Sequence, residues 1–320
     1  MSDQKIYDVI IIGAGPAGLA AGIYAGRAGL SNLIIEQALD GGQIANTSII
    51  ENYPGQNPGG ESGSELIERF SKQAELFGSE RAQDIVQEVD LSSETKTVKG
   101  MMQSYQARSI IIATGSSPRK GGFTGEADFT GRGVSYCATC DGNFFKGLDV
   151  FVIGGGEAAV EEAIYLTKLA RKVTIIHRRD RLRAVESVQE RAKNTPGLEL
   201  MLNSVVESVS GEDALSEIKV KNVVTDEITV IKKNADDDLM GLFVFVGNVP
   251  NSTIFDSELE MNNGYIVTDS DMRTNISGVF AAGDIRDKSF RQVITAASDG
   301  ALAANSVLQY LSTLDGTLYV

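Results

Sequence analysis

Near its beginning the chain reads Tyr7-Asp8-Val9-Ile10-Ile11-Ile12-Gly13-Ala14-Gly15-Pro16-Ala17-Gly18. The apolar run has no helical period and predicts a buried parallel strand, and the glycine turn opens an alanine-rich helix that extends to about Gly29. A second strand, Asn32–Ile35, ends at Glu36. Together these elements predict a dinucleotide-binding unit, because glycines let the backbone approach a pyrophosphate, the helix N-terminus attracts it, and the acid accepts a ribose hydroxyl.

The same pattern returns in the middle of the chain. A strand at Asp149–Ile153 leads into the turn Gly154-Gly155-Gly156-Glu157-Ala158-Ala159, and we expect a helix over about Glu161–Leu169. A further strand at Lys172–Ile176 ends at His177-Arg178-Arg179. The chain therefore contains a second predicted nucleotide-binding unit.

The two units differ at the end of their second strand. Glu36 lies 23 residues after Gly13, and His177 lies 23 residues after Gly154. An acid accepts hydrogen bonds from a free 2′-hydroxyl and repels a 2′-phosphate, whereas arginines clamp that phosphate. The first unit therefore suits FAD or NAD, and the second, whose basic cluster continues to Arg183, suits NADP. A solvated basic patch is the alternative interpretation of this cluster.

Two further strands indicate how the units are connected. Ser109–Gly115 and Gly278–Asp284 each read as a strand followed by a glycine turn. We predict an α/β fold with two Rossmann-like domains, the second inserted into the first. The first domain would comprise residues 1–118 and 248–320, and the second residues 119–247.

Glycines mark both crossings between these domains. The chain would enter the second domain through Arg119-Lys120-Gly121-Gly122 and leave it through Gly247-Asn248-Val249-Pro250. Glycine permits changes of backbone angle at low steric cost. We therefore expect hinges at these crossings.

Cys137 and Cys140 are the only cysteines, and they stand in the segment Cys137-Ala138-Thr139-Cys140-Asp141-Gly142. This spacing suits either a metal site or a reversible disulfide. A structural zinc site needs four ligands, and the chain has neither a second cysteine pair nor more than one histidine, His177. We interpret the pair as a redox-active disulfide, with two incidental cysteines as the alternative.

Composition narrows the class of protein. The formal net charge of −14 argues against nucleic-acid binding, and no apolar run reaches the length of a membrane span. The segment Met1–Lys5 enters a strand without the apolar stretch of a signal peptide. We expect a cytoplasmic protein, where a lone cysteine pair at this spacing is more often catalytic than structural.

Several motifs resemble those of the low-molecular-weight bacterial thioredoxin reductases, class II of the pyridine nucleotide-disulfide oxidoreductases. The resemblance extends over almost the whole chain, and the cysteine pair lies in the inserted domain, as in that class. The motifs are Gly13–Gly18, Gly41-Gly42-Gln43, Glu51-Asn52-Tyr53-Pro54-Gly55, Cys137–Gly142, His177-Arg178-Arg179-Asp180 with Arg183, and Phe280–Asp284 followed by Arg291-Gln292-Val293.

The resemblance implies an NADPH-dependent thioredoxin-disulfide reductase that is a homodimer built largely from FAD-domain surfaces. It assigns FAD to the discontinuous domain and NADPH to the inserted one. The implied FAD-binding residues are Gly13, Gly15, Pro16, Ala17, Gly18, Glu36, Gln37, Gly42, Gln43, Asn52, Ala113, Thr114, Gly115, Gly283, Asp284, Ile285, Arg291, Gln292 and Val293. The implied NADPH-binding residues are Gly154, Gly156, Glu157, Ala158, Ala159, His177, Arg178, Arg179 and Arg183.

The resemblance also implies roles at the disulfide. Electrons would pass from NADPH to FAD, to the Cys137–Cys140 disulfide and then to thioredoxin. Cys140 would face the flavin, Cys137 would attack the partner, and Asp141 would act as acid and base. From its own sequence context, Asp141 before glycine is equally an ordinary turn residue.

Some positions depart from the family pattern, and some alternatives stay open. Glu157-Ala158 replaces residues that commonly supply a hydroxyl donor near the NADPH pyrophosphate, which predicts weaker NADPH binding. Phe144 is a candidate either for partner docking or for core packing. The same chemistry with a peroxiredoxin, a glutaredoxin-like carrier or a dithiol oxidase activity is the alternative function, and a flavin-binding sensor without turnover is a more distant one.

Overall fold

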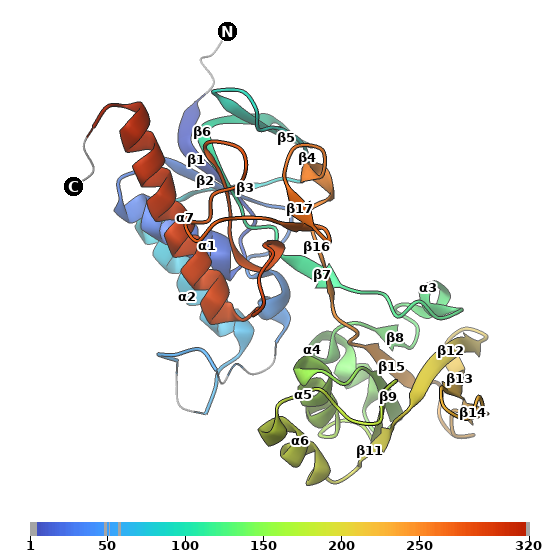
Figure 1. Ribbon diagram of the computed structural model, residues 1–320. Helices are drawn as coiled ribbons and strands as arrows, with labels where there is room; N and C mark the ends of the chain where they lie inside the picture. Colours follow the sequence, from blue (N-terminus) through green and yellow to red (C-terminus); the bar gives the residue numbers. More distant parts are fainter. Residues whose placement is uncertain (1–4, 48–49, 51, 57–58, 318–320) are drawn as a thin grey trace. The chain divides into compact units, whose positions relative to one another are not determined.

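The structure is a computed structural model that describes residues 5–47, 50, 52–56 and 59–317. The chain forms two compact units (Figure 1), one comprising Met1–Ser117 with Val249–Val320 and the other Pro118–Asn248. The second unit is thus inserted into the sequence of the first. Each unit contains a parallel strand–turn–helix arrangement of the kind expected for nucleotide binding, which confirms the predicted fold class.

The first unit is built on a seven-stranded sheet in the order β3-β2-β1-β6-β5-β4, in which β19 also pairs with β6. The strands β1, β2, β3, β6 and β19 are parallel, and β4 and β5 are antiparallel additions. The elements are β1 (Ile6–Ile12), α1 (Pro16–Arg27), β2 (Asn32–Glu36), η1 (Gly42–Asn46), α2 (Gly63–Leu76), β3 (Glu80–Gln83), β4 (Val86–Asp90), β5 (Lys96–Gly100), β6 (Ser104–Ile112), β7 (Ser116–Pro118), β16 (Asn248–Pro250), η3 (Thr253–Phe255), β17 (Met261–Asn262), β18 (Tyr265–Ile266), β19 (Val279–Ala281), η4 (Gly283–Ile285) and α7 (Val293–Leu314).

The first strand shows why this sheet requires a continuous apolar run. Val9 and Ile11 pack into the core that contains residues of α1, α2 and α7, whereas Ile10 and Ile12 pack into the core on the opposite face. Each of the four side chains is almost completely buried, and burial of one such side chain contributes about 1.5–3 kcal/mol. Because both faces are covered, the strand has no polar alternation.

The second unit contains a parallel five-stranded sheet in the order β11-β10-β9-β15-β8 and an antiparallel sheet β12-β13-β14. The phenylalanine and aliphatic residues of β9 and β15 supply the centre of its two cores. The elements are α3 (Glu126–Phe129), β8 (Val134–Ser135), α4 (Ala138–Asp141), η2 (Gly142–Phe145), β9 (Asp149–Ile153), α5 (Glu157–Leu166), β10 (Lys172–Ile176), α6 (Glu186–Lys193), β11 (Leu198–Met201), β12 (Ser204–Gly211), β13 (Leu215–Asn222), β14 (Ile228–Lys232) and β15 (Gly241–Val244).

Two element boundaries differ from the sequence prediction. The helix expected over Glu161–Leu169 is α5, which begins at Glu157 and ends at Leu166. Gly156 has the extended backbone of an N-cap, so the residues read as a turn already form the first helical turn. The strand expected from Ser109 begins at Ser104, because its first residues pair with β5.

The connections between the units contain two short strands and a pair of hydrogen-bonded glycines. The strands β7 and β16 pair with each other as a two-stranded ribbon. Gly121 and Gly122, expected as an entry hinge, lie within the second unit. Their amides donate hydrogen bonds to the carboxylate of Glu126, the first residue of α3, at 2.6 and 2.7 Å, and these bonds hold the two glycines against α3.

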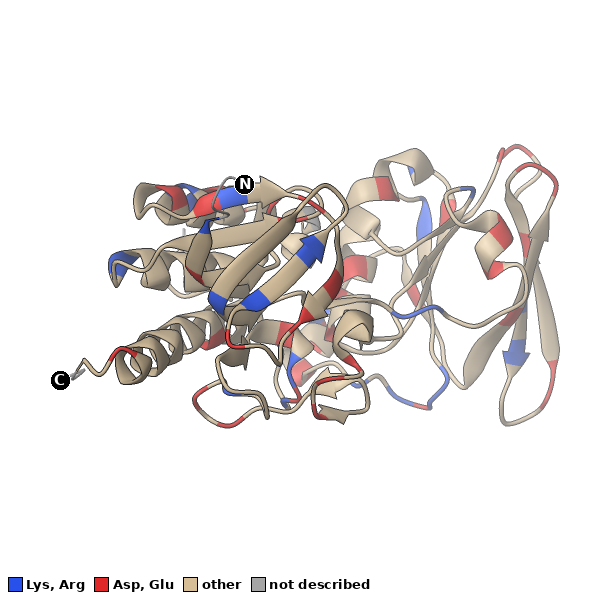
Figure 2. Cartoon of the chain, turned by 90° about the horizontal axis from the view of Figure 1, so that it is seen from above, with Lys and Arg blue, Asp and Glu red and all other residues tan. Residues whose placement is uncertain are grey.

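Figure 2 shows Asp and Glu on helices, strands and loops of the chain, in keeping with the net charge of −14. Within the described residues, no helix is both long enough and apolar enough to cross a membrane.

Candidate active site

The first glycine turn has the shape that a pyrophosphate requires. Gly13 has φ +108°, and a Cβ there would lie 2.4 Å from the carbonyl oxygen of Ala113, so only glycine fits between β1 and the end of β6. A Cβ on Gly15 would meet nothing within 4 Å, which leaves an open approach to the backbone. Pro16 occupies the first turn of α1, and Ala17 and Gly18 are buried behind it. The turn therefore fits a phosphate at a helix N-terminus.

Glu36 stands at the end of β2, beside this turn. Its Oε2 accepts a hydrogen bond from the amide of Ala14 at 2.8 Å, and its Oε1 accepts one from the amide of Gln37 at 2.8 Å. These bonds fix the carboxylate next to the glycine turn. Because Oε1 also accepts a hydrogen bond from the amide of Ala38 at 3.2 Å, Oε2 is the oxygen that retains acceptor capacity for a ribose hydroxyl.

The segment after β19 contains buried polar atoms without partners. Oδ1 of Asp284 and Nε of Arg291 are buried and have no hydrogen-bond partner among the described residues. Burial raises the pKa of Asp284, although Lys288 Nζ lies 3.8 Å from its Oδ1. Buried polar groups are nearly always satisfied, so these atoms fit a site completed by a bound polar ligand. Ile285 is buried beside them.

Asp299 supports this segment from inside α7 and was missed by sequence reasoning. Its Oδ2 accepts hydrogen bonds from the amide of Gly283 at 3.1 Å and from Lys288 Nζ at 2.9 Å. The same oxygen lies 2.9 Å from NH1 of Arg286. No motif marks Asp299, because its partners are tertiary and the surrounding helix is rich in alanine.

Other predicted residues come together from distant parts of the sequence. Asn52 Nδ2 donates to Oε1 of Gln292 at 3.1 Å, and Gln43 Nε2 donates to the carbonyl oxygen of Ser116 at 2.7 Å. Gln292 is also the N-cap of α7, which begins at Val293. Thr114 and Gly115 follow β6, and both bond to Asn251, while a Cβ on Gly42 would lie 4.0 Å from Gly15. Glu51, part of one family motif, lies outside the described residues.

In the second unit, the triple glycine packs against His177. A Cβ on Gly155 would lie 2.4 Å from the imidazole ring, so the ring packs directly against the backbone of the turn. Burial, followed by the charge of Arg183 and its neighbours, lowers the pKa of His177 and favours the neutral form. Its Nε2 is buried and has no hydrogen-bond partner in the described part of the chain. Gly154 has φ +151°, and a Cβ there would lie 2.5 Å from the carbonyl oxygen of Phe245.

The basic cluster lies beside this turn. A Cβ on Gly156 would approach only NH2 of Arg183, at 4.0 Å, and the Arg183 amide donates to the carbonyl oxygen of Gly155 at 2.6 Å. Arg178 and Arg179 are exposed, and neither has an acidic partner within 4 Å in the part of the chain described. Three guanidinium groups near a glycine turn, without an acidic partner within 4 Å among the described residues, suit a phosphate ligand. Glu157, Ala158 and Ala159 form the first turn of α5.

The two cysteines form a disulfide in the second unit, with an S–S distance of 2.12 Å and a Cα–Cα distance of 5.3 Å. Cys137 is the N-cap of α4, and its Sγ accepts the amide hydrogen of Cys140 at 3.2 Å. Asp141 ends this short helix, and its Oδ2 accepts a hydrogen bond from the hydroxyl of Ser135 at 2.6 Å. Ser135 was missed by sequence reasoning because a lone serine has no distinctive pattern.

The aromatic pair after the disulfide divides between surface and core. Phe144 is 75% exposed, whereas Phe145 is buried and packs edge-on against Phe243 with ring centroids 5.3 Å apart. The structure thus rules out core packing as the role of Phe144 in this conformation. An exposed phenylalanine close to the disulfide suits contact with a partner protein.

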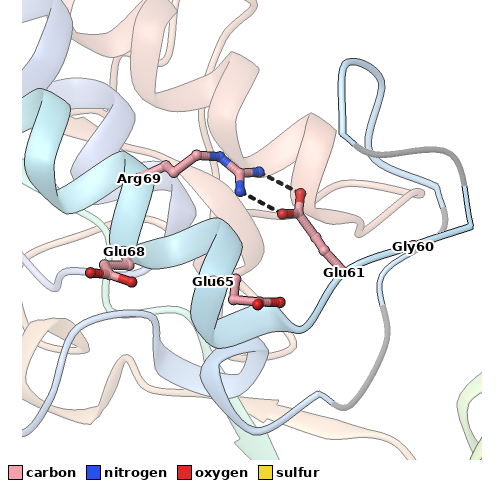
Figure 3. Close-up of a pocket in the computed structure, with 5 residues that line it drawn as sticks. All are labelled: Gly60, Glu61, Glu65, Glu68 and Arg69. Carbon is pink, nitrogen blue, oxygen red and sulfur yellow. Dashed lines mark hydrogen bonds and ion pairs between the residues drawn. The ribbon is translucent and has the colours of Figure 1, made fainter.

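A pocket in the first unit lies outside these residues. Figure 3 shows it at the start of α2, lined by Gly60, Glu61, Glu65, Glu68 and Arg69. Arg69 forms a bidentate ion pair with Glu61, and Glu65 takes part in the capping box with Ser62. These interactions explain the pocket as a feature of the helix start. No group of three or more potential metal ligands occurs among the described residues.

Comparison with known proteins identifies the family. Residues 7–300 match the model of the pyridine nucleotide-disulphide oxidoreductases. The thioredoxin reductase of Peptoclostridium acidaminophilum is 49% identical over 309 residues, which cover 96% of this chain and 98% of that protein. The thioredoxin reductase of Bacillus subtilis is 46% identical over 321 residues, which cover 99% of this chain and 99% of that protein. The crystal structure of Lactococcus lactis thioredoxin reductase has a TM-score of 0.91 at 41% identity, with 96% of this chain and 99% of that chain covered. These similarities confirm the resemblance seen in the motifs, and the chain belongs to the thioredoxin reductase family of the pyridine nucleotide-disulphide oxidoreductases.

Proposed function

We propose that this chain transfers two electrons from NADPH through FAD to its Cys137–Cys140 disulfide, and from there to thioredoxin. The observation that carries the proposal is a closed two-cysteine disulfide in the same unit as a glycine turn with a neighbouring arginine cluster. This combination supplies a dithiol acceptor and a site for a 2′-phosphorylated nucleotide.

The discontinuous unit, Met1–Ser117 with Val249–Val320, is proposed to bind FAD. The open backbone at Gly15 supports a pyrophosphate site, and the unsatisfied atoms of Asp284 and Arg291 support a polar ligand beside it. FAD, when bound, supplies a two-electron carrier between a nicotinamide and a disulfide. The inserted unit, residues 119–247, is proposed to bind NADPH, with Arg178, Arg179 and Arg183 on its 2′-phosphate.

The thiols would then reduce thioredoxin by thiol–disulfide exchange. The Cys137 thiolate attacks one sulfur of the thioredoxin disulfide, which forms a mixed disulfide and releases a thioredoxin thiolate. The Cys140 thiolate attacks the sulfur of Cys137, which restores the enzyme disulfide and releases the second thioredoxin thiolate. Asp141 is proposed to deliver the proton that each departing thiolate needs.

Other features support the partner, the assembly and the location that we propose. The 75% exposure of Phe144 supports a docking contact for thioredoxin near the disulfide. Exposed Tyr24, Ile294 and Leu302 on α1 and α7 support a homodimer formed through the first unit. A redox-active pair that depends on NADPH is expected to work in the cytoplasm.

The alternative keeps the chemistry and changes the acceptor to a peroxiredoxin, a glutaredoxin-like carrier or, for a dithiol oxidase, oxygen. One assay separates these functions: NADPH oxidation by the FAD-loaded protein is measured with thioredoxin, glutaredoxin and peroxiredoxin from the same organism. We expect a much higher kcat/KM with thioredoxin. Faster turnover with either of the other proteins would assign the alternative acceptor, and equal rates without any acceptor would indicate an oxidase.

A further inference from the structure

We infer that Ser135 is a positioning residue that holds Asp141 and the backbone of Cys137 in one hydrogen-bonded unit. The inference rests on the proposed role of Asp141 in proton transfer to the departing thiolate. The distances around the Ser135 hydroxyl carry it: 2.6 Å to Oδ2 of Asp141 and 3.1 Å to the amide nitrogen of Cys137.

The single hydroxyl proton has two acceptors within reach. One is Oδ2 of Asp141 at 2.6 Å, and the other is the carbonyl oxygen of Cys137 at 3.3 Å. A distance of 2.6 Å is typical of a hydroxyl that donates to a carboxylate, and such bonds are stronger than those between neutral groups. The proton therefore goes to Asp141, and a lone pair of the Ser135 oxygen receives the Cys137 amide hydrogen.

Ser135 is well placed for this task because the sheet fixes it. It ends β8, which pairs in parallel with β15, and Ser135 stands opposite Phe243 in that pairing. Only 4% of Ser135 is exposed, so water does not compete freely for its hydroxyl. A side chain on a rigid strand positions its partner better than one on a loop.

Asp141, by contrast, has little other support. It closes the four-residue helix α4, and its amide bonds to the carbonyl oxygen of Cys137 at 3.2 Å. Among the described contacts, its carboxylate has the Ser135 hydroxyl as its hydrogen-bond donor. Without that donor, the Asp141 carboxylate is free to change rotamer. It is then no longer held in one position from which it can deliver a proton to the sulfur atoms.

The test is a double-mutant cycle with Ser135→Ala and Asp141→Asn in the FAD-loaded protein. Ser135→Ala should lower kcat about tenfold and leave the KM for the protein acceptor within about twofold, which corresponds to loss of one hydrogen bond to a charged group. In the Asp141→Asn background, Ser135→Ala should have no further effect, because the hydroxyl acts through the carboxylate. Ser135→Thr, which keeps the hydroxyl, should restore most of the rate.

Two controls separate positioning from a general structural effect. Ser109→Ala removes another fully buried strand hydroxyl, which donates at 2.6 Å to the carbonyl oxygen of Asp8, and it should leave kcat unchanged. Reduction of the Cys137–Cys140 disulfide by dithiothreitol, followed in protein without nucleotide, should slow by a similar factor in Ser135→Ala and in Asp141→Asn.

The outcomes also separate this inference from the proposed function. The cycle uses whichever acceptor the wild-type protein reduces, and the dithiothreitol measurement needs no acceptor, so failure with thioredoxin removes only the proposed acceptor. A full further loss of kcat from Ser135→Ala in the Asp141→Asn background would overturn the inference. An unchanged kcat in the single variant, or a matching loss in Ser109→Ala, would overturn it as well.

Discussion

The ionised carboxylate of Glu162 should destabilise the folded protein, and the substitution Glu162→Gln, which has nearly the same shape, should remove this destabilisation. This residue lies in α5, and its Oε2 is buried without a hydrogen-bond partner among the described residues. Burial, and then repulsion by Glu161, raises the pKa of Glu162 from 4.5 to about 7. A shift of this size corresponds to about 3 kcal/mol between the two protonation states.

The sign of the pH dependence follows from the direction of this shift. The folded protein retains a proton on Glu162 that the unfolded chain releases above pH 4.5, so the free energy of unfolding falls as the pH rises from 4.5 to about 7. Glu162→Gln cannot ionise and escapes this loss. We expect the variant to be more stable by about 3 kcal/mol at pH 8.5 and by less than about 1 kcal/mol at pH 5.

Thermal unfolding of the full chain measures this difference. For units of this size the variant should melt roughly 6–12 °C above the wild type at pH 8.5, and within about 3 °C of it at pH 5. Glu161→Gln removes an exposed carboxylate that lies 4.0 Å from NH1 of Arg191 and makes the smaller contribution to the shift of Glu162, so it should change the melting temperature by no more than about 2 °C at either pH. A pH-independent difference for Glu162→Gln, or a lower melting temperature at pH 8.5, would refute the reasoning.

The remaining predictions concern the proposed reaction. Replacing Arg178 and Arg179 with alanine should raise the KM for NADPH about ten- to a hundredfold and leave NADH kinetics nearly unchanged, whereas equal use of NADH and NADPH by the wild type would contradict a phosphate clamp. Cys137→Ser and Cys140→Ser should each abolish thioredoxin reduction but still allow NADPH to bleach the flavin; loss of bleaching in both would place the thiols before hydride transfer. Phe144→Ala should raise the KM for thioredoxin about tenfold at unchanged flavin reduction, and an unaltered KM would exclude it from the docking surface.

The sequence predicted those parts of the fold whose cause is local. The strands around Gly13 and Gly154 are apolar runs bounded by glycine turns, so both nucleotide-type units and their order could be read directly. The predicted start of α5 was wrong because Glu157 and Ala158 were interpreted as part of the glycine turn. Glutamate and alanine are both common in the first turn of a helix, and here they form it. The antiparallel strands β12–β14 had no counterpart in the prediction, since much of their surface is exposed and their pattern is weak.

The candidate site was predictable where residues belong to motifs and not where they act through tertiary contacts. The disulfide, the glycine turns and the arginine cluster stand where the sequence indicated. Asp299 and Ser135 escaped notice, because each owes its importance to groups that the fold brings to it. Gly121 and Gly122 were identified as hinge candidates, but the hydrogen bonds from their amides to Glu126 had no signal in the sequence.

The ribbon of β7 and β16 gives the chain a modular construction. Neighbouring paired strands lie about 5 Å apart, so the insertion leaves and rejoins the discontinuous unit at almost one point. Such an insertion can be excised or exchanged without stretching its host, because a short turn suffices to rejoin the cut ends. The segment 118–248 is thus suited to exchange as one intact domain. Recombination at Ser117 and Val249 offers an evolutionary route by which one flavin-binding domain could acquire different electron-accepting domains.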